Sequence, residues 1–222
     1  MRLNYALLFL FSLSAYIFPQ GEPDIILSEV MFYPASGNNE FIELYNQSET
    51  EYINLASFTL KYYTSNPDSI KDAGYGTVLP PRSYAVIFEG DYSLDSGIYK
   101  NLIPSEALIL KIKDNSFGTN GMANTTSRVL YLIRSPGDSS QVYTYSANNQ
   151  LSFSDEKILL SGDNTSGNWG NSLHLNGTPG YKNSISPKML DVEANLLTVT
   201  PSLILSGGTA TVNMKVVNRG FN

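Results

Sequence analysis

The sequence contains no cysteine and a single histidine, His174. Without cysteine the chain forms no disulfide, no thiolate metal site and no cysteine nucleophile. One histidine excludes a metal site built from several histidines and weakens any Ser-His-Asp reading. The sequence also lacks a Gly-x-Ser-x-Gly elbow, a phosphate-binding P-loop and a His-Glu-x-x-His motif. These absences predict a protein with no catalytic residues and no cofactor, and therefore not an enzyme.

Positive charge is also scarce. The chain has 14 basic residues against 20 acidic ones, which gives a formal net charge of −6. A protein that binds a phosphate backbone needs a basic stripe that releases counterions. No nucleic-acid partner is therefore expected.

The first 21 residues have the composition of a secretory signal peptide. Met1 and Arg2 supply a basic start, residues 5–18 are almost entirely apolar, and Pro19-Gln20-Gly21 ends the run. The alternative is a membrane anchor, but a spanning helix needs about 18–20 apolar residues. The pattern predicts a signal helix over residues 1–21 that is cleaved, no stable membrane span, and a product that is secreted or held at the cell surface.

From residue 25 onward the pattern alternates with a period of two. Phe58, Leu60 and Tyr62 alternate with more polar neighbours, as do Leu108, Leu110 and Ile112. This spacing places one apolar row on one face of each strand. Further strands are expected over residues 84–88, 129–133 and 142–145, with a turn at Ser135-Pro136-Gly137-Asp138. Residues 115–126 and 161–176 are rich in Gly, Asn and Ser and are expected to form long surface loops. Many short strands without a helical period indicate an all-β sandwich.

A second unit is expected after a linker at residues 185–190. Val192, Ala194 and Leu196 are spaced by two, and so are Ala210, Val212, Met214 and Val216. This pattern resembles the opening strands of a CARDB-like adhesion domain. Residues 191–222 are too few for a sandwich domain of about 100 residues. The expectation is an incomplete second sandwich and a chain that is a fragment of a longer parent; the alternative is that these strands dock on the first domain.

Five phrases spread over residues 24–184 resemble the lamin-tail domain, an immunoglobulin-like β-sandwich also found in secreted bacterial proteins. The strongest is Glu40-Phe41-Ile42-Glu43-Leu44-Tyr45-Asn46, and the last is Gly177-Thr178-Pro179-Gly180. Phe58 replaces a frequent Trp, and Arg82 and Ser83 stand where the family's Pro-Pro-Gly-Gly-Tyr turn has two glycines. The resemblance implies a lamin-tail-like sandwich over residues 22–184. It also implies structural roles for these motif residues: Glu29, Phe41, Glu43, Tyr45, Phe58, Trp169, Gly177, Pro179 and Gly180.

Three other groups of residues are weaker candidates for a metal, catalytic or ligand-binding site. Asp163, Asn164 and Asn168 gather oxygen ligands in one loop and are weak calcium candidates, although Asx-rich loops more often form turns. The acid pairs Asp91 with Asp95 and Asp155 with Glu156 are expected to lie in solvated turns rather than in a catalytic cleft. The residues of a third group lie on or near loops, where exposed rings offer stacking faces for carbohydrate or protein, although aromatic residues are common in strands anyway: Tyr62, Tyr63, Tyr75, Tyr92 and Tyr99.

The resemblance implies a binding, adhesion or scaffolding module at the surface of a cell, bacterial in type and without catalytic activity. The partners it implies are proteins or carbohydrates. The alternative is a targeting module of a larger secreted hydrolase or nuclease whose catalytic part lies elsewhere. The residues that bind a ligand are not identified by the sequence.

Overall fold

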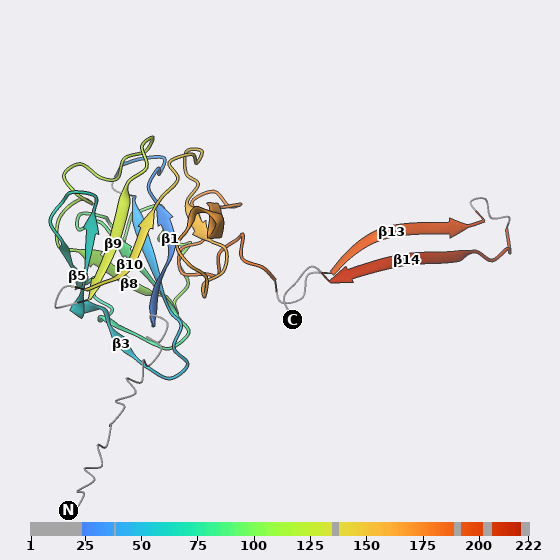
Figure 1. The fold of residues 1–222 in the computed structure, drawn as a ribbon, viewed down its shortest axis with the longest axis horizontal. Coiled ribbons are helices and arrows are strands. Elements are labelled where there is room, and N and C mark those ends of the chain that lie inside the picture. Colours follow the sequence, from blue (N-terminus) through green and yellow to red (C-terminus); the bar gives the residue numbers. More distant parts are fainter. Residues whose placement is uncertain (1–23, 38, 135–137, 189–191, 202–205, 219–222) are drawn as a thin grey trace, which may run out of the picture.

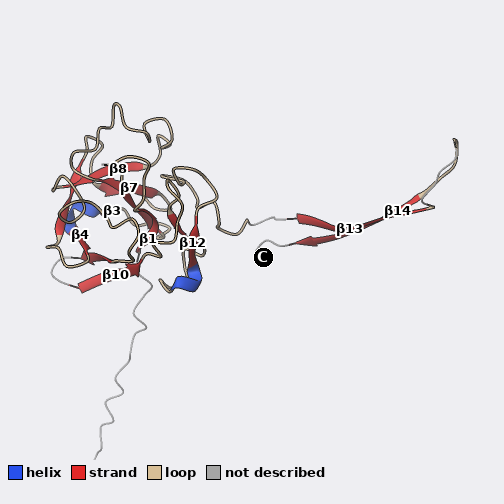
Figure 2. Ribbon diagram, turned by 90° about the horizontal axis from the view of Figure 1, so that it is seen from above, coloured by secondary structure: helices blue, strands red, loops and turns tan. Residues whose placement is uncertain are grey.

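The computed structural model describes residues 24–37, 39–134, 138–188, 192–201 and 206–218. The predicted signal peptide and the turn at residues 135–137 lie outside these ranges. Within them the protein is almost entirely β, with two short 3₁₀ helices, η1 (Leu55–Ser57) and η2 (Ser166–Asn168). Figures 1 and 2 show a rounded body of strands and a separate two-stranded arm.

The body is an immunoglobulin-like sandwich formed by one curled run of ten strands, in the order β10-β9-β4-β5-β8-β7-β2-β1-β11-β12. Seven of these come from the first two-thirds of the chain: β1 (Ile25–Met31), β2 (Phe41–Asn46), β4 (Phe58–Tyr62), β5 (Asp68–Asp72), β7 (Tyr84–Phe88), β8 (Leu108–Ile112) and β9 (Val129–Arg134). The last three are β10 (Asp138–Thr144), β11 (Asp155–Lys157) and β12 (Trp169–Asn171). A small sheet pairs β3 (Ile53–Asn54) with β6 (Val78–Leu79).

Strand β5 joins the two layers of the sandwich. Its first residues, Asp68 and Ser69, pair with β4, whereas Ile70, Lys71 and Asp72 pair with β8. The strands are antiparallel except for β7 and β8, which are parallel. Because β5 changes partner along its length, the layers separate beside it, and this is where the structure places a pocket described below.

The main core lies between the two layers. Ile42 and Leu44 of β2 pack in one cluster with Leu60 of β4 and Leu130 and Leu132 of β9. The predicted alternation is confirmed in β8 and β9, where buried residues alternate with partly exposed ones. It is wrong for β7, where Ala85 to Phe88 are all buried, because the outer face of this layer is covered as well.

A second, smaller core covers the outer face of the large layer. Phe41 and Phe88 pack there with Tyr92 and Tyr99, which lie in the connection between β7 and β8. Tyr92 stacks on Phe88 with ring centroids 4.1 Å apart, and Phe41 meets Tyr99 edge to face. The expectation that Tyr92 and Tyr99 offer surface stacking faces is therefore wrong: both rings are buried.

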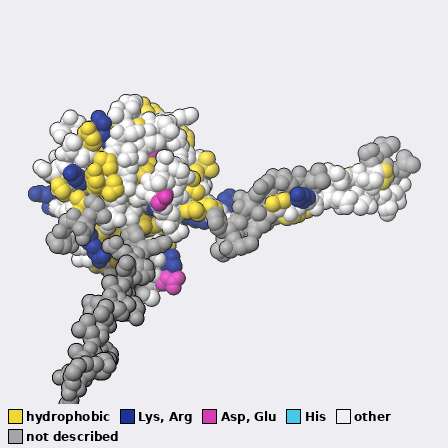
Figure 3. Space-filling view, viewed as in Figure 1, with side chains coloured by type: hydrophobic (Ala, Val, Ile, Leu, Met, Phe, Trp, Pro, Cys, Tyr) yellow, Lys and Arg dark blue, Asp and Glu magenta, His cyan; other side chains and the backbone are white. Residues whose placement is uncertain are grey.

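The arm consists of β13 (Val192–Thr200) and β14 (Thr211–Asn218), which pair antiparallel. Both strands were expected from the alternation of apolar residues. Leu197 pairs with Met214 and Val199 with Val212, so these four side chains share one face. They and Val216 are exposed, and the space-filling view shows apolar side chains along the arm (Figure 3).

Candidate functional site

Three glutamates lie side by side on the outer face of the large layer. Glu29 of β1 pairs directly with Glu43 of β2 on one side and with Glu156 of β11 on the other. All three are fully buried. Directly paired residues on neighbouring strands share a face, and like charges there repel. The sheet therefore presents a row of three carboxyl groups that is closed off from solvent.

The segment around the closing phrase covers this row and donates hydrogen bonds to it. The Thr178 N–H donates to Glu29 Oε1 over 2.9 Å, and the Gly180 N–H donates to Glu43 Oε2 over 2.5 Å. Farther along, the Ser184 hydroxyl donates to Glu156 Oε2 over 2.7 Å. The glutamates thus satisfy backbone and hydroxyl donors that a buried loop would otherwise leave unpaired.

Burial raises the pKa of two members of this row, Glu29 and Glu43. Desolvation first, and the neighbouring Glu156 second, raise the pKa of Glu29 to about 8. Desolvation and the charge of Glu29 raise the pKa of Glu43 well above its usual value. Glu43 Oε1 has no hydrogen-bond partner within the described residues, which also disfavours the ionised form. Glu29 and Glu43 are therefore protonated parts of a structural clamp, away from the solvent that a general base needs.

The glycines of the closing phrase are required by close packing. Gly177 has a φ of +73°, and a Cβ there would run into the Glu29 carboxyl group. Gly180 has a φ of +84°, and its Cβ would lie 2.6 Å from Pro104 Cδ. Pro179 is buried between them. The closing phrase is thus fitted between the glutamate row and the connection that follows β7.

The other motif residues are structural as well. Trp169 stacks on Tyr143 with ring centroids 3.6 Å apart, although its indole N–H finds no partner in the described part of the chain. Phe58 is buried in the main core, with the Arg134 guanidinium 5.5 Å from its ring centre. Tyr45 lies against Tyr84 with ring centroids 4.7 Å apart.

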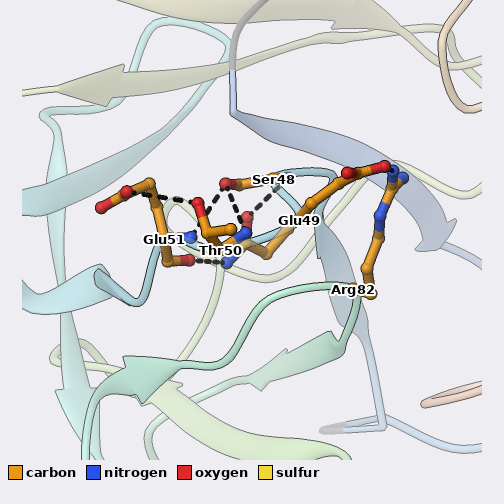
Figure 4. A network of polar contacts seen from close by, with 6 residues as sticks. Ser48, Glu49, Thr50, Glu51 and Arg82 are labelled. Atoms are coloured by element: carbon orange, nitrogen blue, oxygen red, sulfur yellow. Dashed lines mark hydrogen bonds and ion pairs between the residues drawn. The ribbon is translucent and has the colours of Figure 1, made fainter.

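Asn46, the last residue of the strongest phrase, organises the turn after β2. Its side-chain amide donates to the carbonyls of Glu51, Leu79 and Pro80, and its Oδ1 accepts the Ser48 N–H. Figure 4 shows the exposed part of this turn, where Ser48 holds the backbone of the next residues and Arg82 forms a 2.7 Å ion pair with Glu49. Arg82 adopts a φ of +55°, a left-handed conformation that favours the glycine it replaces.

A second acid pair lies at the opposite, inner face of the large layer. Because Phe41 pairs with Phe88, Glu40 and Glu89 stand opposite each other just beyond the strand ends. Glu40 accepts the Met122 N–H with both carboxyl oxygens, at 2.8 and 2.7 Å, and Glu89 accepts the Phe117 N–H over 3.3 Å. Sequence reasoning missed this pair. The sequence does contain a signal for it: Glu40 directly precedes the apolar strand β2, and Glu89 directly follows the apolar strand β7.

Glu40 and Glu89 hold loop 115–122 in place through these hydrogen bonds. Phe117 and Met122 are buried in the main core, whereas Thr119 and Asn120 are exposed. The Tyr62 hydroxyl accepts the Ala123 N–H over 2.8 Å at the end of the loop. The prediction that residues 115–126 form an irregular loop is confirmed, since no strand or helix occurs there.

A pocket of about 300 Å³ opens between this loop and the turn that joins β4 to β5. Its floor is the end of the core, including Ile42, Leu60 and Phe117, and Tyr62 forms one wall. The rim is polar and carries three exposed side chains that donate or accept no hydrogen bond within the described residues: Thr64, Asn66 and Thr119.

The calcium candidates act as turn formers. Asp163 Oδ1 accepts the backbone N–H and the hydroxyl of Thr165. Asn168 Nδ2 donates to the carbonyls of Leu159 and Asp163, and Asn164 Nδ2 donates to Gln141. Among the residues that the structure describes, no group of three acidic, histidine or cysteine side chains is arranged to hold a metal ion. Residues 161–176 are not a bare loop, because η2 and β12 lie within them.

The two acid pairs weighed for catalysis differ. Asp91 and Asp95 are exposed in the connection after β7, as expected. Asp155 and Glu156 are buried in β11, so the expectation of a solvated turn is wrong for them. Asp155 Oδ2 accepts the Tyr143 hydroxyl over 2.7 Å and the Ser146 N–H over 2.8 Å. Because these two acids point to opposite faces of one strand, they do not converge on a substrate.

The surface aromatics that remain are fewer than the sequence suggested. Tyr63 and Tyr75 are exposed, and Tyr62 is half-buried in the pocket wall. The Arg128 guanidinium lies 4.3 Å from the centre of the Tyr63 ring. His174 is exposed between two exposed leucines, Leu173 and Leu175, and therefore does not pack into the core.

No helix within the described residues has the length and apolar character needed to cross a membrane. A search of curated proteins finds no significant match to this chain. A family model named Lamin Tail Domain matches residues 19–164. The match ends before Trp169 and the closing phrase, yet these residues pack against the matched strands. Since the matched residues make up more than half of the sequence, the chain belongs to the lamin tail domain family.

Proposed function

We propose that this protein is a non-catalytic binding module of the cell surface or the extracellular medium, and that its ligand site is the pocket beside Tyr62. The buried acids of the sandwich hold loops in place and are shielded from solvent. The rim of the pocket supports this assignment. The side chains of Thr64, Asn66 and Thr119 form no hydrogen bond within the described residues and lie above apolar residues at the floor of the pocket. Pockets that combine an apolar lining with a few free polar groups are typical ligand sites.

The chemistry of the rim favours a carbohydrate. Two hydroxyls and one carboxamide offer donors and acceptors without net charge, as an uncharged polyhydroxylated ligand requires. One basic and two acidic side chains, Lys61, Asp68 and Asp114, also border the pocket, and this mixture of charges does not select a strongly charged ligand. The Tyr62 ring supplies an apolar face at the side of the pocket, on which a sugar ring can stack. A peptide ligand is the competing outcome.

Export is supported by the composition of the first 21 residues, and we propose that they are removed after secretion. The arm supports a second module. Its apolar face, formed by Leu197, Val199, Val212, Met214 and Val216, is of the kind that a sandwich buries against a facing sheet. We propose that β13 and β14 are the opening strands of a CARDB-like domain, which suits an adhesion protein or a targeting module of a larger hydrolase.

The test is a saccharide array of neutral and acidic oligosaccharides probed with the exported protein. The double variant Thr64→Ala/Thr119→Ala removes both rim hydroxyls, and the expected result is a loss of saccharide binding of at least tenfold. A matched control, Thr125→Ala/Thr126→Ala, changes two exposed threonines beyond the pocket and should bind as the parent does. Binding that is equal in both double variants, or binding to peptides alone, would overturn the carbohydrate assignment.

A further inference from the structure

Glu40 and Glu89 hold loop 115–122 by an arrangement that depends on a proton. Two carboxyl groups stand opposite each other, are 6% and 1% exposed, and accept N–H groups from the two ends of the loop. Glu89 Oε2 has no partner among the described residues. Two ionised carboxylates in such a place repel each other and lack solvation, so a proton must be shared between them.

The loop has few other attachments. A Cβ at Gly121 would lie 2.9 Å from Glu40 Oε1, so the backbone reaches the carboxyl group there without an intervening side chain. Met122 and Phe117 enter the core next to the acid pair. Thr119, which lies between these two anchors, forms part of the pocket rim. Release of either anchor would therefore move one wall of the pocket.

We propose that Glu40 and Glu89 form a proton-dependent latch that holds loop 115–122 in place as one wall of the pocket beside Tyr62 and releases it as the pH rises. This latch would regulate the ligand site, so its biological meaning rests on the proposed function. The opening and closing of the latch do not rest on the proposed function, because the loop is held or released whether or not a ligand is present.

The surroundings of the pair set the direction of the response. Desolvation, and then the charge of Glu89, raise the pKa of Glu40 to about 9. Desolvation raises the pKa of Glu89 to about 7, and Asp91 adds to this effect. Lys111 is the cation on the neighbouring strand, and its ammonium group donates to the carbonyls of Gly90 and Tyr92. Burial is the main cause that raises the pKa of the Tyr99 and Tyr145 phenols, and the charge of Glu40 adds to it. Both phenols therefore stay neutral while the acids titrate.

The sign follows from these values. Both acids have pKa values above their usual 4.5, so their protons are bound in the closed loop and are lost as the pH rises through about 7 and about 9. At the far end of the loop, the Tyr62 hydroxyl accepts the Ala123 N–H and the Tyr145 hydroxyl donates to the Ala123 carbonyl, and neither bond involves an acid that titrates in this range. Opening is therefore expected at Phe117 and Met122.

The absence of cysteine makes the test direct. Asn120→Cys places a unique thiol on the exposed part of the loop, and a nitroxide attached there reports the mobility of the loop by electron paramagnetic resonance. Spectra are recorded on the full chain from about pH 6 to about pH 9.5, a range that spans both titrations. The expected result is an immobile component near pH 6 that is replaced by a mobile one as the pH rises.

Two further variants decide whether the acids cause the change. Glu40→Gln and Glu89→Gln, each combined with Asn120→Cys, remove one ionisable group and should keep the label immobile at the highest pH. Glu106→Gln, an exposed glutamate, is the control and should follow the parent. A label whose mobility does not change with pH, or changes equally in the parent and in both glutamine variants, would overturn the latch. If one glutamine variant fails to fold, the other still decides. If the label changes mobility as expected in a protein that binds no saccharide on the array, that pair of results would confirm the latch and contradict the proposed function.

Discussion

Glu29 and Glu43 lie directly opposite each other on β1 and β2, and neither side chain is exposed to solvent. Together with Glu156 they receive the closing segment of the sandwich. A pair of like charges in this place would be strongly unfavourable, so Glu29 and Glu43 are held protonated. Structure and acidity are therefore coupled in this protein.

The stability of the sandwich is expected to fall as the pH rises from about 5 to about 8. The folded pKa of Glu29, about 8, lies above the usual value of 4.5, so the folded state binds more protons between those values and loses stability through that window. Each such group contributes a slope of about 1.4 kcal/mol per pH unit. Urea unfolding at a series of pH values measures it.

Glu43→Gln should reduce that slope, since it replaces a group whose pKa is raised by a neutral one of the same shape. The variant is expected to equal the parent near pH 5 and to exceed it in stability near pH 8. Glu106→Gln, at an exposed position, should leave the slope unchanged. An identical pH dependence in the parent and Glu43→Gln would show that the row does not hold protons.

Gly177→Ala should destabilise the protein by about 2–4 kcal/mol, because the new methyl group meets the Glu29 carboxyl group and the residue keeps a positive φ. Gly76→Ala separates the steric clash of the new methyl group from the strain of a positive φ. Gly76 also has a positive φ, of +85°, but has open space around its Cβ position. That variant should cost only about 1 kcal/mol. Equal costs in thermal unfolding would contradict the close fit of the closing phrase.

Asn46→Ala should cost about 2–4 kcal/mol, because three carbonyl groups lose their donor in a buried place. The matched change Asn120→Ala removes an exposed amide in a loop and should stay within about 0.5 kcal/mol of the parent. Chemical unfolding of both variants measures the difference. A cost for Asn46→Ala as small as that for Asn120→Ala would remove Asn46 as the organiser of the turn.

Arg82→Gly should leave stability unchanged or raise it by about 1 kcal/mol. Glycine relieves the left-handed strain at this position, and the ion pair to Glu49 that is lost contributes little because both side chains are exposed to solvent. Glu49→Gln breaks the same ion pair without changing the backbone, so the two variants separate strain from charge. A clear loss of stability in Arg82→Gly alone would show that the arginine itself is required.

The sequence predicted the fold class because alternation in β4, β8 and β9 reports burial on one face. It did not predict strand β11, because Asp155-Glu156-Lys157 has no apolar alternation; these residues are buried because β11 pairs with β1 on one side and β12 on the other. The burial of Tyr92 and Tyr99 also escaped prediction. Their cover over the outer face depends on the long connection after β7, and no local pattern encodes such packing.

The candidate site was predictable only in part. The resemblance pointed to Glu29, Glu43 and the closing phrase, but the reason for their presence is the pairing of strands far apart in the sequence. The same holds for Glu40 and Glu89, which the register of β2 and β7 brings together. The pocket arises where β5 changes partner, and a change of partner leaves no mark in the residues of β5.

The central claim is that buried, protonated glutamates hold the loops of this sandwich in place. Carboxyl carbon chemical shifts of glutamate, followed by nuclear magnetic resonance over a pH titration, test it most directly. In the folded protein we expect Glu29 to titrate at about pH 8 and Glu40 at about pH 9, and we expect the pKa of Glu43 to lie well above the usual glutamate value of 4.5. Titration of all three near the usual value would contradict the account.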